Sequence, residues 1–160
     1  MDLKSVLRLI ANLNEEKAEY ILVGAGALNI LGVVRATEDV DFFIRPDLPN
    51  IELVKSALRA TWDDPSIDEI QADELLSDYP VIRYGPPGET YTVDLMTRLG
   101  EAVHYQDLEW EWRELDAIPI RVATPATLYR MKAGTLRAQD HLDAALLKEL
   151  YGLKGGDGAG

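Results

Sequence analysis

The sequence contains no cysteine and comparatively few basic residues, and each shortage excludes a class of protein. Without cysteine there is no disulfide, no catalytic thiol and no thiolate metal site. Lys and Arg number 16 against 28 Asp and Glu, and the net charge of −12 argues against non-specific binding to DNA or anionic membranes. No apolar run approaches the roughly 20 residues of a membrane span, and residues 1–14 do not read as a signal peptide. We expect a cytoplasmic protein with no membrane partner.

The length and composition predict one globular domain. The chain has 160 residues, of which 47% are apolar and 28% charged, and this is ordinary globular composition. We expect a single domain over residues 1–151, followed by a flexible Gly-rich tail at 152–160.

Hydrophobic periodicity predicts an α+β fold in which a small mixed sheet is flanked by helices. The last four of the expected strands form two hairpins, and two helices close the chain. Helices are expected over 2–13, 27–31, 51–60, 125–136 and 138–151, and strands over 20–23, 40–44, 80–84, 91–95, 109–115 and 118–122.

Three carboxylates stand in otherwise apolar strands. Asp39 and Asp41 bracket Val40, and residues i and i+2 of a strand share a face at a separation of roughly 6.6 Å. Asp94 lies in the strand expected at 91–95. If the two strands are neighbours, all three side chains meet on one surface.

A cluster of this kind suits a divalent cation. Unpaired carboxylates at close range repel one another and raise each other's pKa, and a cation removes that cost. Mg²⁺ is held by carboxylates and substrate phosphates, and two such ions can clamp an in-line phosphoryl displacement. The pattern therefore favours Mg²⁺, with Mn²⁺ as a substitute, and nucleotidyl transfer as the reaction.

A glycine turn, GAG at residues 24–26, joins the first strand to a helix. Backbone N–H groups at such a turn form an anion site suited to a triphosphate. The turn is neither a Walker A loop, because no Gly-Lys-Ser/Thr follows, nor a dinucleotide-binding fingerprint.

The order of these features resembles the nucleotidyltransferase superfamily with the polymerase-β-like fold. The turn is followed by RATEDVDFFI at residues 35–44, which looks most like the small bacterial branch of AbiEii-type and toxin–antitoxin transferases. TPATLYRMK at 124–132 and RAQDHLD at 137–143 are similar to the helical Lys…Arg-x-x-Asp-x-x-Asp motif of that branch.

The resemblance implies a role for each matched residue. Asp39 and Asp41 would be metal ligands, and Asp94 a third ligand or the base that takes the proton of the acceptor hydroxyl. Gly24 and Ala25 would approach the phosphates.

Four further positions are implied to be part of the nucleotide site. Lys132 would pair with the triphosphate, and Asp140 would either orient Lys132 or help to activate the acceptor. Arg35 would either hold the Asp pair through a salt bridge or line the pocket, and Thr37 belongs to the same motif.

The resemblance implies an enzyme that moves a nucleoside monophosphate from an NTP to an acceptor. The acceptors open to it are RNA such as a tRNA 3′ end, a protein side chain or a small molecule, and a toxin–antitoxin role implies an antitoxin partner. Ala25 replaces the usual Gly or Ser of the turn, so the alternative is a catalytically weak or inactive member that binds a nucleotide or a protein. A third reading is a minimal antitoxin-like transferase that modifies a toxin.

Overall fold

The computed structural model describes residues 2–33, 35–77, 80–99, 103–133, 135 and 137–153. Residues 154–160 of the expected tail lie outside the described part. The helices are α1 (Leu3–Glu15), α2 (Gly24–Ile30), α3 (Leu48–Thr61), α4 (Ala72–Leu75), α5 (Pro125–Ala133) and α6 (Ala138–Tyr151), with 3-10 turns η1 (Pro65–Glu69) and η2 (Tyr105–Asp107). The strands are β1 (Tyr20–Val23), β2 (Asp39–Ile44), β3 (Val81–Tyr84), β4 (Thr92–Met96), β5 (Arg98–Leu99), β6 (Val103–His104), β7 (Trp110–Leu115) and β8 (Ile118–Ala123).

A mixed sheet forms the centre of the fold, as the sequence predicts. Its six strands run in the order β3-β4-β2-β1-β8-β7, and β5 pairs separately with β6. β2 is parallel to β4 and β1 is parallel to β8, whereas the other neighbours are antiparallel. β2 and β4 therefore lie side by side, although 47 residues separate the end of one from the start of the other.

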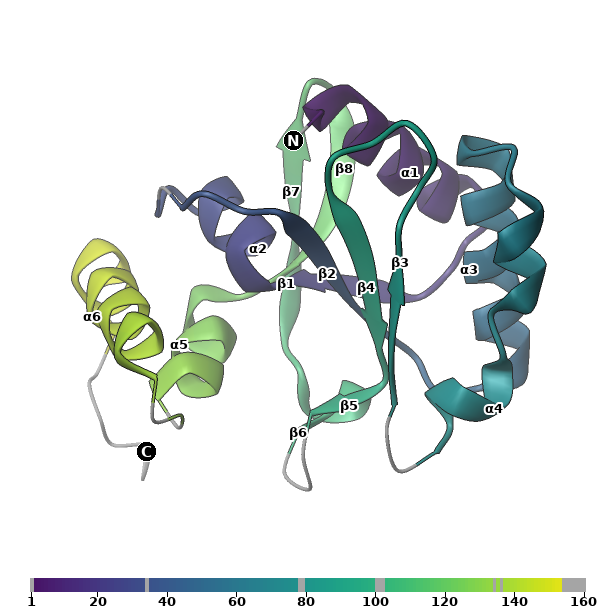
Figure 1. Ribbon diagram of the computed structural model, residues 1–160. Helices are drawn as coiled ribbons and strands as arrows, with labels where there is room; N and C mark the ends of the chain where they lie inside the picture. Colours follow the sequence, from purple (N-terminus) through teal and green to yellow (C-terminus); the bar gives the residue numbers. More distant parts are fainter. Residues whose placement is uncertain are drawn as a thin grey trace.

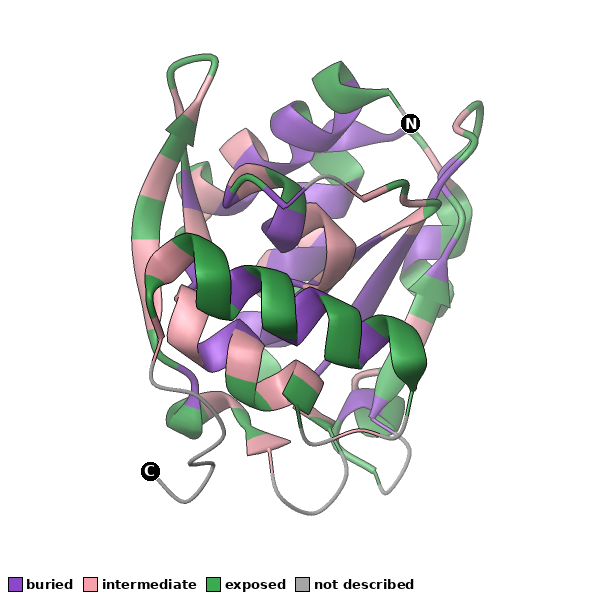
Figure 2. Ribbon diagram, turned by 90° about the vertical axis from the view of Figure 1, so that its left-hand side faces the viewer, coloured by how far each residue is buried: buried purple, intermediate pink, exposed green. Residues whose placement is uncertain are grey.

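Helices cover both sides of this sheet (Figure 1). α1 and α3 pack against each other on one side, and α5 and α6 lie on the other. Asp2 caps the N-terminus of α1, since its carboxylate accepts a hydrogen bond from the Lys4 N–H, and the apolar stripe of α1 from Val6 to Leu13 is buried. The outer face of α6 is exposed and its inner face is buried (Figure 2).

Three details differ from the sequence-based predictions. α2 begins at Gly24, inside the expected turn, and not at residue 27. α5 ends at Ala133, whereas the helix was expected to reach residue 136. Of residues 134–136 the structure describes Thr135, which lies outside a helix. The prediction missed β5 and β6, because strands of two residues leave no alternation to detect.

No helix in the described part of the chain is long and apolar enough to cross a bilayer.

Candidate active site

The acidic residues of β2 and β4 meet on one face of the sheet. Asp41 is directly opposite Asp94 in the parallel register, and Asp39 is opposite Thr92. One carboxylate oxygen from each of the three aspartates lies within 4.8 Å of the others. Asp94 is buried and the other two are half-buried. The sequence analysis assumed that these two strands are neighbours. The parallel pairing of β2 with β4 brings Asp39, Asp41 and Asp94 together.

Gly24 brings the backbone against this cluster. Val23 pairs with Asp41 at the end of β1, so the first residue of α2 lies beside the Asp41 carboxylate. Gly24 has φ +69°, and a Cβ there would lie 2.1 Å from Oδ2 of Asp41. Only glycine allows both this backbone conformation and this approach. Ala25 follows in the first turn of α2.

The cluster is electrostatically unfavourable for Asp41. Burial, together with the negative charges of Asp39 and Asp94, raises the pKa of Asp41 to about 7, and the positive charge of Lys132 opposes this rise. Clustered carboxylate oxygens are the hard donors that divalent cations prefer. The residues therefore fit a Mg²⁺ or Mn²⁺ ion, which would replace the proton of Asp41 as the compensating charge.

Arg83 contacts the cluster, and the sequence analysis did not identify it. It is opposite Asp94 on β3, and its Nε donates to Oδ1 of Asp94 at 3.0 Å. Its Nη2 lies 3.1 Å from Oδ2 of Asp94 and 3.4 Å from Oδ2 of Asp39. Hydrogen bonding to Asp94 raises the pKa of Arg83. The hairpin expected from residues 80–84 and 91–95 already placed β3 beside β4, but it left open the register that sets Arg83 opposite Asp94.

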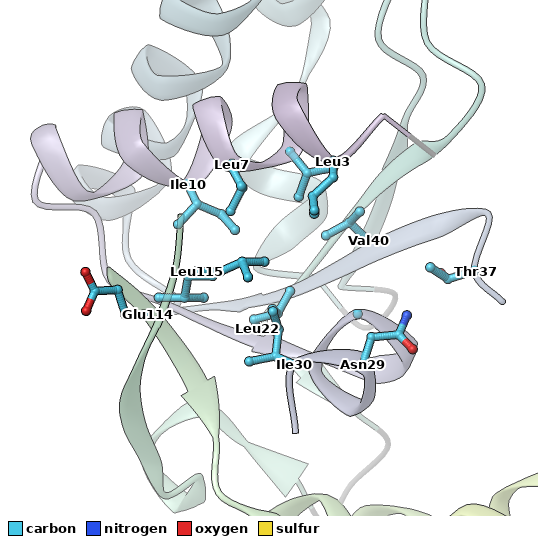
Figure 3. A pocket seen from close by; sticks show the side chains of 13 residues that line it. Leu3, Leu7, Ile10, Leu22, Asn29, Ile30, Thr37, Val40, Glu114 and Leu115 are labelled. Atoms are coloured by element: carbon cyan, nitrogen blue, oxygen red, sulfur yellow. The ribbon is translucent and has the colours of Figure 1, made fainter. Parts of the chain in front are cut away.

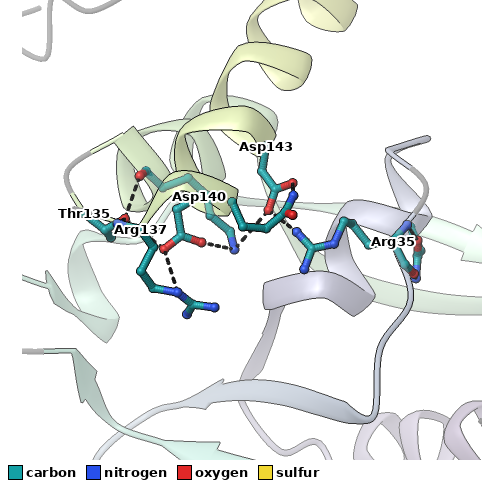
Figure 4. Close-up of polar contacts among 8 residues, drawn as sticks. Arg35, Thr135, Arg137, Asp140 and Asp143 are labelled. Atoms are coloured by element: carbon teal, nitrogen blue, oxygen red, sulfur yellow. Dashed lines mark hydrogen bonds and ion pairs between the residues drawn. The ribbon is translucent and has the colours of Figure 1, made fainter.

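A second polar cluster joins α5 to α6 (Figure 4). Lys132 Nζ donates to Oδ1 of Asp140 at 2.9 Å, and the Thr135 hydroxyl donates to Oδ2 at 2.8 Å. Burial opposes the ionisation of Asp140, but the hydrogen bonds from Lys132 and Thr135 outweigh it and lower the pKa of Asp140. The Asp140 carboxylate thus contacts both the Lys132 ammonium group and the Thr135 hydroxyl.

Arg35 takes part in this second cluster and not in the first. Its Nη1 lies 2.6 Å from Oδ2 of Asp143, whose side chain is fully buried (Figure 4). Lys132 Nζ is 3.5 Å from the same oxygen. The expectation that Arg35 holds the Asp pair of β2 is therefore not met, because its ion pair among the described residues is with α6. Asp143 belongs to the Asp-x-x-Asp pattern of residues 140–143, which could have singled it out.

Thr37 lies apart from the acidic cluster. It lines a largely apolar cavity of about 350 Å³ between α1, α2 and the β7–β8 hairpin (Figure 3). Val40 lines the same cavity, so the cavity is on the opposite face of β2 from Asp39 and Asp41. The Thr37 hydroxyl bonds to the carbonyl of Asp39 and so fixes the start of β2. None of the three aspartates lines this cavity.

A family match covers most of the chain. The profile described as "Nucleotidyl transferase AbiEii toxin, Type IV TA system" matches residues 7–151, which is most of the chain. The chain belongs to the AbiEii nucleotidyltransferase family. This AbiEii-family chain is accordingly a nucleotidyltransferase, and the toxin–antitoxin setting is that of its family. No curated protein matches it.

Two solved structures share the fold of this AbiEii-family chain. An antigenic nucleotidyltransferase-like protein from Paracoccidioides brasiliensis is 18% identical with a TM-score of 0.57, over 93% of this chain and 76% of that one. ANT(2″)-Ia, crystallised with adenylyl-2″-tobramycin, is 13% identical with a TM-score of 0.52, over 90% of this chain and 86% of that one. Similarity at this level of identity establishes the nucleotidyltransferase-like fold.

Proposed function

We propose that the protein is a Mg²⁺-dependent nucleotidyltransferase that moves a nucleoside monophosphate from an NTP to a hydroxyl of an acceptor. The observation that carries this proposal is the convergence of Asp39, Asp41 and Asp94 within 4.8 Å at the end of a glycine turn. A bound Mg²⁺ would neutralise phosphate charge and polarise the reacting phosphoryl group.

The protein's own residues divide the remaining work. Asp39 and Asp41 hold the cation, and Asp94 serves as the third ligand or as the base for the acceptor proton. The acceptor oxygen forms a bond to the α-phosphorus, the α–β phosphoanhydride bond breaks, and pyrophosphate leaves with its electron pair.

The triphosphate lies on the side of Gly24, Ala25 and Lys132. Lys132 acts electrostatically on Asp41, which supports a position where its ammonium group would pair with the triphosphate. Asp140 accepts a hydrogen bond from the ammonium group of Lys132 and so holds it in position. The backbone of Gly24 lies against Asp41. Arg35 and Thr37 shape the segment that leads into β2, rather than touching the nucleotide.

The acceptor is proposed by class. RNA, including the 3′ end of tRNA, is the first candidate, and a protein side chain or a small molecule are the others. The family's toxin–antitoxin setting supports an antitoxin as a partner of the protein, and an NTP as its substrate.

Label transfer tests the function and the acceptor together. Each α-labelled NTP is incubated with Mg²⁺, total RNA and protein extract, using wild type and Asp41→Asn. We expect label in RNA or protein with wild type, loss of transfer with Asp41→Asn, and full transfer with the exposed-site control Asp107→Asn. Absence of transfer from all four NTPs, or transfer that survives in Asp41→Asn, contradicts the proposal.

A further inference from the structure

Arg83 lies outside every motif of the sequence, yet its guanidinium engages two of the three clustered carboxylates. It forms two hydrogen bonds to Asp94, and the same Nη2 reaches Asp39. Asp94 and Asp39 are two of the three carboxylates that a cation at this cluster would use. A guanidinium and a divalent cation would therefore draw on the same carboxylates, and two cations at this distance repel each other.

The two members of the main ion pair differ in their freedom to move. The Asp94 side chain is 8% exposed and lies on β4, between two other strands of the sheet, whereas the Arg83 side chain is 65% exposed. Arg83 also lies on β3, which is the edge strand of the sheet. The guanidinium can therefore leave the cluster for solvent without any change in the backbone.

On the basis of the proposed function, we propose that Arg83 is a resident counter-cation of the acidic cluster, which competes with the divalent cation for Asp94 and Asp39 and is displaced when that cation binds. Arg83 is a positioning residue in this role, because it holds Asp94 in place until the cation arrives. Arg83 also weakens the binding of a divalent cation without nucleotide. The acidic cluster therefore favours a cation that binds together with a negatively charged triphosphate.

Binding of Mn²⁺ without nucleotide tests this role directly. The unbound Mn²⁺ is measured by electron paramagnetic resonance during titration of the full chain. We expect Arg83→Gln to bind Mn²⁺ about fivefold more tightly than wild type, as suits the loss of a solvent-exposed ion pair. Arg83→Lys keeps the charge but not the planar fork, so its affinity lies between the two. Arg59→Gln removes the same charge from an exposed pair with Asp68 and leaves the affinity unchanged.

The outcomes separate the role of Arg83 from the proposed function. Unchanged or weaker Mn²⁺ binding by Arg83→Gln overturns the counter-cation role. If Asp41→Asn abolishes binding in that same experiment, the metal site stands and only the role of Arg83 fails. If neither wild type nor Arg83→Gln binds Mn²⁺, both proposals fail. Thermal unfolding of each variant in EDTA verifies that folded proteins are compared.

Discussion

At the scale of single residues, Asp41 is where folding and function conflict. It is the carboxylate that burial and two neighbouring aspartates make hardest to ionise, with a pKa raised from 3.8 to about 7. A protein selected only for stability would place an uncharged side chain there. The position is explained if the conflict is resolved by a bound cation.

Asp41→Asn should therefore stabilise the metal-free protein while it abolishes activity. Between about pH 4 and pH 7, native Asp41 retains a proton that unfolded Asp41 has released, so the free energy of unfolding falls as the pH rises through this window. Asparagine removes this dependence. Urea denaturation in EDTA should show a gain of about 2 kcal/mol at pH 8 and almost none near pH 4. A variant less stable than wild type at pH 8 would contradict this reasoning.

Gly24 is the second residue whose identity is dictated by geometry. Gly24→Ala would place a Cβ 2.1 Å from the Asp41 carboxylate, at a backbone φ of +69°. We expect a loss of about 2 kcal/mol or more in the free energy of unfolding, together with loss of Mn²⁺ binding. Gly26→Ala, in the same helix as Gly24, is the matched control. Its Cβ would make an ordinary 3.7 Å contact with the Leu22 side chain of β1. Equal stability of the two variants would show that the close approach at Gly24 does not matter.

At the scale of elements, the α5–α6 pair is attached to the site through buried charge. Arg35, which precedes β2, and Lys132 of α5 both contact the Asp143 carboxylate of α6. The side-chain amide of Asn29 in α2 bonds to the backbone N–H and C=O of Arg35. The segment before β2 is thus held from α2 and α6, and Lys132 of α5 is also held from α6.

Removal of Asp143 should loosen this attachment. Asp143→Ala leaves Arg35 and Lys132 without a fully buried anion between them, and breaking a buried pair in this way costs about 3 kcal/mol. Equilibrium urea denaturation measures the loss. Glu149→Ala, on the exposed side of the same helix, should change stability by less than about 0.5 kcal/mol. A similar small effect for Asp143→Ala would show that the cluster does not hold α6.

At the scale of the whole molecule, cation binding and folding should be linked. A ligand that binds only the native state stabilises it, by about 2.7 kcal/mol at roughly 100 times its dissociation constant. Mg²⁺ should therefore raise the melting temperature of wild type but not of Asp41→Asn. KCl at equal ionic strength separates this effect from general screening of the −12 net charge. Equal responses of the two proteins to Mg²⁺ would place its binding elsewhere.

The sequence predicted the site better where local pattern sufficed than where distant segments meet. The spacing of Asp39 and Asp41 and the motif of residues 35–44 indicated the family, and the six strands of the main sheet were located within one or two residues. The predicted hairpin of 80–84 and 91–95 did not reveal Arg83, because its contact with Asp94 depends on the register of the two strands. Of the two roles open to Arg35, the salt bridge to the Asp pair of β2 is replaced by one to the buried Asp143 of α6. Register and long-range ion pairs depend on packing, and one sequence carries no direct sign of them.

The parallel pairing of β2 with β4 also bears on how the protein is made. The acidic cluster needs Asp94, and the groups that hold Lys132 lie as far along the chain as Asp143. A ribosome must therefore have released the polypeptide through Asp143 before all of these contacts can form. A nascent chain that ends before Asp94 lacks the third carboxylate, so the acidic cluster cannot assemble in step with the synthesis of β2.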